Sequence, residues 1–141
     1  MSNNQQIIPM LAYEDGLAAM GWLCDVFGFT ENMRMTDDAG RLAHGELKMG
    51  DSLVMLAEPS PNYQGPAHHA QNCETAAKWG TVPYIINGVL VYVDDVVAHY
   101  NIAKSKGAII LSELEYGFPG TRYRAADLEG QRWMFMQIEK N

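Results

Sequence analysis

The sequence repeats itself at a spacing of 80 residues, and this repeat constrains the fold more than any other feature. The segment Leu11–Ala18 resembles Val91–Ala98, and each copy runs from apolar residues through an acidic pair into a helical pattern. Gly50 and Gly130 are also 80 residues apart, and a strongly apolar run follows each of them. Because both ends of the unit keep the same spacing, we expect two copies of one structural unit in tandem.

Apolar residues at three- and four-residue steps predict one helix in each half. The first helix follows Asp15 as its N-cap and ends at Gly28, and the second follows Asp95 and ends at Gly107. The other apolar segments predict strands at Ile7–Ala12, Thr30–Thr36, Arg41–Lys48, Ser52–Ala57, Val89–Val93, Ala108–Leu111, Thr121–Ala126 and Trp133–Ile138. Each half is therefore expected to be a strand, a helix and three further strands.

A long connector joins the two halves. The stretch Glu58–Pro83 is rich in Pro, Asn, Gly and Gln and shows no clear periodicity, which predicts an irregular segment. We expect one domain of 141 residues with repeats at about 7–58 and 84–139, joined by a loop at about 59–83. The loop is either a lid over a site or a plain linker.

Two of the predicted strands are apolar at successive positions instead of alternating. Leu53–Leu56 and Trp133–Met136 contain no charged residue, and such strands are usually covered on both faces. The helices can cover one side of a sheet in so short a chain. The other side is then expected either to curve around a cavity or to meet a partner subunit, and a concave pocket follows as a hypothesis.

The charge and the cysteine content exclude several classes of function. The formal net charge is −7, which disfavours binding to nucleic acid or to an anionic membrane surface. No run approaches the roughly 20 apolar residues of a membrane span, and the first residues lack the pattern of a signal peptide. Cys24 and Cys73 are too few for a disulfide framework, so we expect free thiols and a cytoplasmic location.

Two phrases of the sequence resemble a known superfamily. Val91–Val96 reads Val-Tyr-Val-Asp-Asp-Val and Asp127–Trp133 reads Asp-Leu-Glu-Gly-Gln-Arg-Trp; with the tandem units they resemble the vicinal oxygen chelate superfamily. That group includes glyoxalase I, bleomycin-resistance proteins, extradiol dioxygenases and fosfomycin-resistance enzymes. His44–Leu47, followed by Gly50–Ser52 and the ending at Trp133, resembles the glyoxalase/bleomycin-resistance-like branch compared with the PhnB proteins.

The resemblance implies a fold and an assembly. The implied fold is α+β, with tandem βαβββ modules forming a curved mixed sheet, as in the glyoxalase/bleomycin resistance/dihydroxybiphenyl dioxygenase fold. It also implies a homodimer, in which two chains pair their sheets or exchange units. Because this superfamily hosts many chemistries, function has to be argued from the site.

The superfamily's enzymes hold a divalent metal with His or Glu in the first and last strands of each unit. The positions that match in this sequence are Ile8 and Gly88 for the first strands, and Val54 or Met55 together with Met134 for the last. None of these side chains suits a hard divalent cation or zinc. We therefore expect no metal or other cofactor, and a protein that binds a small organic molecule of the antibiotic or metabolite kind. The acidic chain would suit a cationic ligand.

A polar pair marks a candidate catalytic site. A tight hairpin around Gly50 would place Glu46 opposite Met55, with His44 and Glu46 on one face. If Met55 faces the cavity, His44 and Glu46 point into it and are suited to acid–base catalysis. The alternative function is then a lyase, isomerase or dioxygenase that uses a non-standard metal site or metal-free catalysis. Otherwise the pair is a polar patch at the sheet edge or the dimer seam.

Arg122 and Arg124 share a face because they are two residues apart on a predicted strand. Their planar guanidinium groups are suited to a carboxylate or phosphate of a ligand. The competing interpretation is a structural ion pair, with Glu46 or Glu113 as the partner.

Apolar and aromatic residues are expected to line the ligand site. The candidates are Met55, Tyr92, Trp133 and Met134. For Trp133 a place in the core is favoured, because alternate positions of that strand must cover the helix. A third possibility is that methionine side chains fill the cavity.

Overall fold

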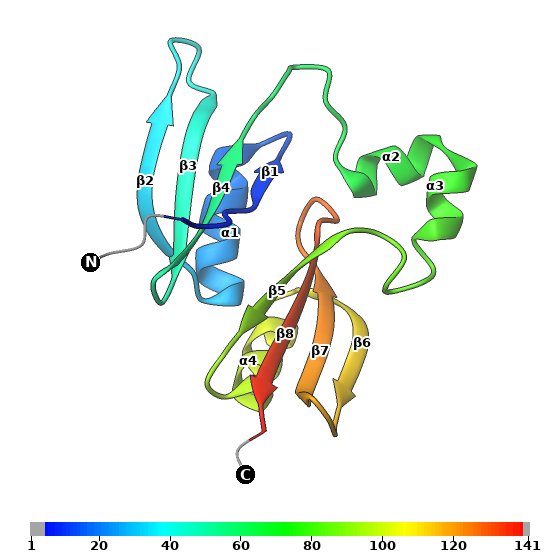
Figure 1. The fold of residues 1–141 in the computed structure, drawn as a ribbon. Helices are drawn as coiled ribbons and strands as arrows, with labels where there is room; N and C mark the ends of the chain where they lie inside the picture. The colour runs from blue at the N-terminus through cyan, green and yellow to red at the C-terminus, as the bar shows by residue number, and fades with distance from the viewer. Residues whose placement is uncertain (1–4, 140–141) are drawn as a thin grey trace. The chain divides into compact units, whose positions relative to one another are not determined.

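The computed structural model describes residues 5–139, and these divide into two compact units. Among the described residues, unit 1 consists of 5–24 together with Gly28–Tyr63, and unit 2 consists of Asp25–Phe27 together with 64–139. Each unit contains a four-stranded sheet with a helix against it (Figure 1).

Unit 1 contains one strand before its helix and three after it. Its elements are β1 (Met10–Ala12), α1 (Gly16–Phe27), β2 (Thr30–Thr36), β3 (Leu42–Met49) and β4 (Ser52–Ala57). The strand order is β1-β4-β3-β2, with β1 parallel to β4 and the other pairs antiparallel. The predicted hairpin is confirmed, since Met49 pairs with Ser52 and Glu46 pairs with Met55.

Unit 2 repeats this arrangement after two short helices. Its elements are α2 (Pro66–Asn72), α3 (Glu74–Trp79), β5 (Gly88–Tyr92), α4 (Val96–Ser105), β6 (Ile109–Glu115), β7 (Gly120–Ala126) and β8 (Arg132–Ile138). The strand order is β5-β8-β7-β6, and β5 is parallel to β8. The expected α+β class is confirmed, and the structure contains two four-stranded mixed sheets, one in each unit.

Several strand boundaries shift by one residue from the sequence-based expectations, and three differences are larger. Strand β1 begins at Met10 and not at Ile7, because Pro9 has no N–H for a sheet. Strand β6 continues to Glu115, beyond the expected end at Leu111, because two irregularities in register let it stay beside β7. The connector is not irregular throughout: α2 begins at Pro66, a residue that the first turn of a helix tolerates.

Both predicted helix starts are confirmed. An Asp15 side-chain oxygen accepts a hydrogen bond from the N–H of Ala18 at 3.1 Å, and Asp95 accepts one from Ala98 at 3.0 Å. These bonds satisfy backbone donors that the first turn of a helix leaves without partners. Helix α1 ends at Gly28, whose φ of 81° is the left-handed conformation that favours glycine.

The core of unit 1 lies between α1 and one face of its sheet. Leu47 and Leu56 are buried there, and the Met20 sulfur lies so close to Gly45 that a Cβ would collide with it. Glu58 follows β4 and accepts hydrogen bonds from the N–H groups of Gly16 and Leu42 and from Arg41. Burial alone would raise the pKa of Glu58, but these bonds outweigh it and lower the pKa.

The core of unit 2 is an aromatic cluster against α4. Phe27, His99, Tyr123, Trp133 and Phe135 stack or meet edge to face within it. Trp133 is 1% exposed, and its indole N–H donates to a carboxylate oxygen of Asp127 at 3.0 Å. The core position favoured for Trp133 is therefore confirmed.

Neither Cys24 nor Cys73 forms a disulfide. Over residues 5–139, no helix has the length and apolar character needed to cross a membrane.

Candidate functional site

In each unit one face of the sheet packs against α1 or α4 (Figure 1), and we call the opposite face the open face. In unit 1, Leu47 and Val54 point toward α1 and are buried, so the alternate positions His44, Glu46 and Met55 lie on the open face. The sequence-based condition for His44 and Glu46, that they share a face with Met55, is met within unit 1.

Strand register identifies which positions of the two units are equivalent. Met10 pairs with Met55 in unit 1, and Leu90 pairs with Met134 in unit 2. Met10 and Leu90 are 80 residues apart, as the repeat requires, so Met55 is the counterpart of Met134. The alternative counterpart, Val54, is buried on the helix side.

The residues present do not fit the divalent metal that the resemblance implies. Met55 and Met134 are thioethers on the open faces, where the last-strand ligands would stand. Gly88 has no side chain, and a Cβ there would lie 3.1 Å from the carbonyl oxygen of Arg132. Within residues 5–139, no group of three or more His, Cys, Asp and Glu side chains is placed to hold a metal ion.

The His44–Glu46 pair is formed in the structure. The Nε2 of His44 lies 2.8 Å from Oε2 of Glu46, and the side-chain amide of Asn32 donates to Oε1 of Glu46, also at 2.8 Å. The hydrogen bonds from His44 and Asn32 lower the pKa of Glu46. A carboxylate that receives both bonds can orient the imidazole, and an oriented imidazole is suited to acid–base catalysis.

An apolar recess of about 200 Å³ lies beside this pair. Its lining includes His44, Met10, Met55, Ala57 and Pro59. Ligand sites in proteins are mostly apolar with a few polar groups, and this recess has that composition on a smaller scale.

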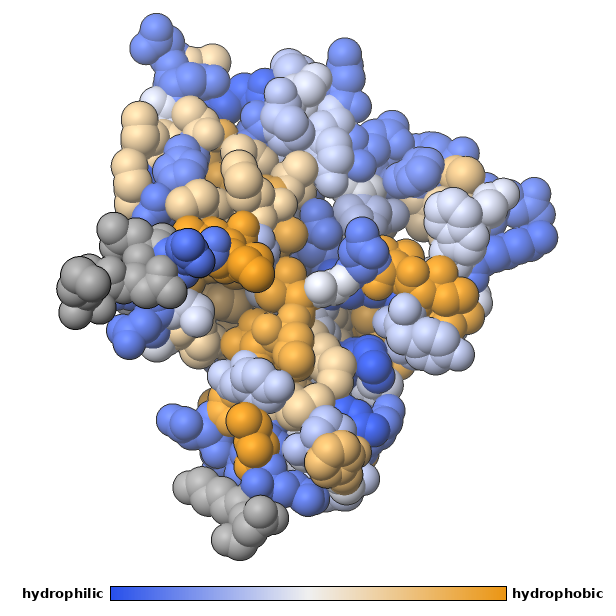
Figure 2. Space-filling view, viewed as in Figure 1, coloured by the Kyte–Doolittle hydropathy of each residue, from blue (hydrophilic) through white to orange (hydrophobic). Residues whose placement is uncertain are grey.

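The open face of unit 2 carries four of the predicted ligand-binding residues. Tyr92, Arg122, Arg124 and Met134 lie on it together with Leu90, and register sets Arg124 and Leu90 on either side of Met134. Leu90 is 46% and Tyr92 is 56% exposed. In Figure 1 α4 lies behind this sheet, and Figure 2 shows hydrophobic side chains gathered over β5 and β8 on the side away from α4. Trp133 is not on this face.

The partner of the two arginines differs from the expectation. Arg122 Nη2 lies 3.1 Å from Oε2 of Glu115, and Arg124 Nη1 lies 3.9 Å from Oε1 of the same residue. Glu113 is not their partner, because its carboxylate accepts a hydrogen bond from Tyr100. Glu46, in unit 1, bonds to His44 and Asn32. The cause is the register of β6, which places Glu115 opposite Arg122.

A second apolar recess, of about 210 Å³, adjoins this face. Tyr84, Leu90, Arg124 and Met134 are among its lining residues. Arg132, which also borders it, donates to the carbonyl oxygens of Val82 at 2.5 Å and Gly80 at 3.0 Å. Burial lowers the pKa of Arg132. These two bonds hold the segment after α3 against β8 and so form one wall of the recess.

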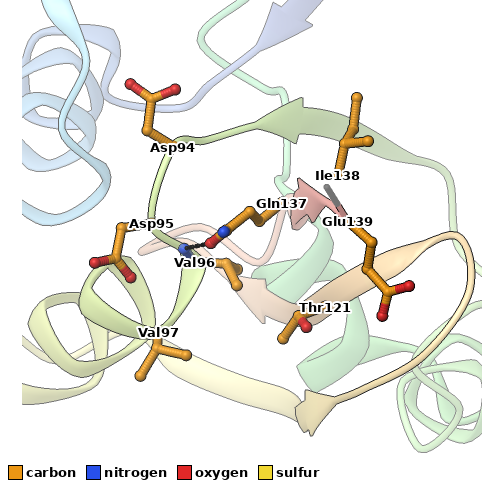
Figure 3. A pocket seen from close by; sticks show the side chains of 8 residues that line it. All are labelled: Asp94, Asp95, Val96, Val97, Thr121, Gln137, Ile138 and Glu139. Atoms are coloured by element: carbon orange, nitrogen blue, oxygen red, sulfur yellow. Dashed lines mark hydrogen bonds between the residues drawn. The ribbon is translucent and has the colours of Figure 1, made fainter. Parts of the chain in front are cut away.

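A third recess, of about 610 Å³, lies where β8 ends beside the start of α4 (Figure 3). Gln137 points to the backbone of Val96 and accepts its N–H at 2.9 Å. The carboxylates of Asp94, Asp95 and Glu139 point in different directions, and Asp95 is the helix cap described above (Figure 3). This arrangement does not converge on a ligand.

Sequence reasoning missed Asn32, Glu115 and Leu90 at these sites. Asn32 lies where the register of β2 shifts, and Glu115 lies beyond the predicted end of its strand. Leu90 had a usable signal, because the 80-residue repeat maps it onto the first strand of unit 1, where Met10 stands.

The comparisons with known proteins decide the family. The sequence model of the Glyoxalase/Bleomycin resistance protein/Dioxygenase superfamily matches residues 8–135. The chain belongs to this superfamily. Among solved structures, TioX from Micromonospora sp. ML1 is 28% identical to this chain, with a TM-score of 0.69, and the match covers 97% of this chain and 98% of TioX.

Two further proteins are similar to this chain. TnmS3 from Streptomyces sp. CB03234, described as an antibiotic binding protein, is 15% identical with a TM-score of 0.65, and the match covers 98% of this chain and 100% of TnmS3. At that identity the likeness shows the fold alone. The uncharacterized protein Rv0887c of Mycobacterium tuberculosis is 28% identical over 130 residues, which are 92% of this chain and 72% of that protein.

Proposed function

We propose that this protein binds a small organic molecule, of the antibiotic or metabolite kind, on the open faces of its sheets and without the divalent metal of the superfamily's enzymes. The observation that carries the proposal is the pair of equivalent methionines, Met55 and Met134. Each stands on an open face, at the position in the last strand where a metal ligand would be required. Flexible, polarisable methionine side chains suit contact with an apolar ligand.

The surroundings of these methionines support the proposal. Each borders a recess lined mostly by apolar side chains, of about 200 Å³ at Met55 and about 210 Å³ at Met134. Complete sites for drug-sized ligands span roughly 300–1,000 Å³, so each recess is of a size to hold one end of such a ligand. The antibiotic-binding description of TnmS3, a protein of the same fold, points in the same direction.

The test is thermal unfolding of the chelator-treated protein with a panel of polycyclic natural products that includes bleomycin. A saturable rise in Tm that EDTA leaves unchanged is expected for at least one compound. Met134→Lys should remove that rise, while Leu128→Lys, at an exposed position in the turn before β8, should not. A rise that appears only with added metal, or for no compound, would contradict the proposal.

The second candidate is an enzyme, and the His44–Glu46 hydrogen bond of 2.8 Å is the observation that favours it. The oriented imidazole would act as acid or base beside the recess at Met55, in a lyase, isomerase or dioxygenase reaction. His44→Gln and Glu46→Gln should then abolish turnover. If the protein only binds its ligand, the same variants should keep affinity within about tenfold, or about 1.4 kcal/mol.

Three narrower statements belong to the same proposal. The chain is assigned to the PhnB-like branch on the motifs at His44–Leu47 and Gly50–Ser52. It is expected to act as a homodimer and in the cytoplasm. Sedimentation of the purified protein tests the dimer, with a monomer at all concentrations as the contrary result.

A further inference from the structure

The open face of unit 2 already holds one carboxylate between two guanidinium groups. Glu115 presents Oε2 to Arg122 at 3.1 Å and Oε1 to Arg124 at 3.9 Å, so its two oxygens are divided between the two arginines. Arg122 also donates to the carbonyl oxygen of Gly120, which fixes the position of its side chain. A carboxylate from another molecule would find the same donors in the same arrangement.

Glu115 is held loosely enough to be displaced. Its side chain is 46% exposed, and exposed ion pairs contribute only about 0–1 kcal/mol to stability. The two arginine side chains are better covered, at 22% and 26% exposure, and therefore are less free to leave this face. An incoming carboxylate replaces one anion with another and leaves no arginine without an acceptor.

An apolar surface for a flat ring lies next to these donors. Arg124 pairs with Met134, and Met134 pairs with Leu90, so guanidinium, thioether and leucine follow one another across three strands. The recess of about 210 Å³ begins at these residues, and Tyr84 borders it. Ser112 lies opposite Arg124, and its buried hydroxyl has no hydrogen-bond partner among the described residues.

The charge of this face differs in sign from the charge of the chain. The protein carries a formal net charge of −7, which would suit a cation, but the strands of unit 2 place three arginines (Arg122, Arg124 and Arg132) and one glutamate on the open face. Displacing Glu115 leaves the face with three positive charges. The local charge, and not the net charge, decides which ligand is attracted at contact distance.

We infer that the open face of unit 2 binds a flat aromatic carboxylate, with the carboxylate between Arg122 and Arg124 in place of Glu115 and the ring over Leu90 and Met134. This inference rests on the proposed function and narrows it to one class of ligand. Glu115 then acts as a built-in competitor that weakens the affinity of the site for anions.

The test uses three probes that share a ring system and differ in charge: 2-naphthoate, 2-naphthamide and 2-naphthylmethylammonium. Isothermal titration with each, in EDTA at neutral pH, should rank the carboxylate first. Arg122→Met and Arg124→Met should each weaken 2-naphthoate binding about tenfold or more, as expected for a charge-assisted hydrogen bond, and leave 2-naphthamide nearly unchanged.

Glu115→Gln should change the affinity for 2-naphthoate in the opposite direction to the arginine variants. It removes the competing charge, so 2-naphthoate should bind several-fold more tightly than to the wild type. Glu113→Gln is the matched control on the same strand, because its carboxylate bonds to Tyr100 and not to the arginines, and it should leave the affinity unchanged.

Two results would overturn the inference. One is equal binding of all three probes with no effect of the arginine variants, which would leave the proposed function standing if natural products still raise the Tm. The other is no binding of 2-naphthoate to either the wild type or Glu115→Gln. The proposed function fails separately, when no compound of the natural-product panel stabilises the protein.

Discussion

Trp133 and Met134 are neighbours on β8 that face opposite ways, and replacing each by alanine separates core packing from ligand contact. Trp133 faces α4, is 1% exposed and stacks on Phe135. Met134 lies on the open face of the same strand. We expect Trp133→Ala to lower the free energy of unfolding strongly, and Met134→Ala to affect mainly ligand affinity.

The magnitude follows from what the indole loses. Removing a fully buried tryptophan side chain costs about 3–5 kcal/mol through lost burial and the cavity left behind. The variant also removes the N–H that donates to Asp127, itself 1% exposed, and loss of a bond to a buried charged group costs about 1–3 kcal/mol. Because relaxation absorbs part of both costs, we expect about 3–5 kcal/mol in total, or a fall in Tm of roughly 10–17 °C.

Urea unfolding followed by far-ultraviolet circular dichroism measures this cost without relying on tryptophan fluorescence. Trp133→Phe, which keeps a ring and loses the N–H, should cost about 1–3 kcal/mol and covers the case in which the alanine variant does not fold. Met134→Ala should cost about 1 kcal/mol or less. A Trp133→Ala protein of unchanged stability that has lost ligand affinity would refute the reasoning and place Trp133 in the ligand site.

Other variants test the remaining parts of the structure. Burial lowers the pKa of His99 in the folded protein. The free energy of unfolding should therefore be at its full value above pH 6.5, the ordinary pKa of histidine, and should fall by at most about 1.4 kcal/mol per pH unit below that, until the folded-state pKa is reached. His99→Gln should remove this loss of stability, which urea titrations at pH 7.5 and 5.5 would measure. Glu58→Gln should lower the free energy of unfolding by about 1–3 kcal/mol at pH 7. Because the pKa of Glu58 is lowered in the folded protein, this stabilisation is present above about pH 4.5 and is lost as the pH falls through the folded-state pKa. Equal stability of the variant and the wild type at pH 7 would contradict this role of Glu58. Gly120→Ala should lower the free energy of unfolding by about 1–3 kcal/mol, because the added Cβ would overlap the carbonyl oxygen of Gln137. Gly21→Ala is the control: Gly21 is exposed on a helix with open space around it, so calorimetry should show unchanged or higher stability.

Features set by local chemistry could be predicted from the sequence. Asp15 and Asp95 cap their helices as expected, because a short acceptor before an apolar period satisfies the first N–H groups whatever lies further away. The register of Glu46 with Met55 also followed from local information, since a tight hairpin leaves one way to pair the strands.

Features that depend on distant partners could not be predicted in the same way. The extension of β6 to Glu115 depends on two register irregularities against β7, and no short pattern marks them. The assignment of Glu113 to the arginines failed for this reason. The choice between Val54 and Met55 likewise needed the parallel pairing of β1 with β4, which joins residues far apart in the sequence.

The metal content of the purified protein tests the central claim most directly. The protein should be prepared without a histidine tag or chelator, dialysed in turn against Mn, Fe(II), Ni and Zn, and analysed for metal per subunit. Because thioethers stand at Met55 and Met134, we expect no stoichiometric metal under any of these conditions. One tightly held metal ion per subunit would contradict the account and make His44 and Glu46 the first ligands to replace.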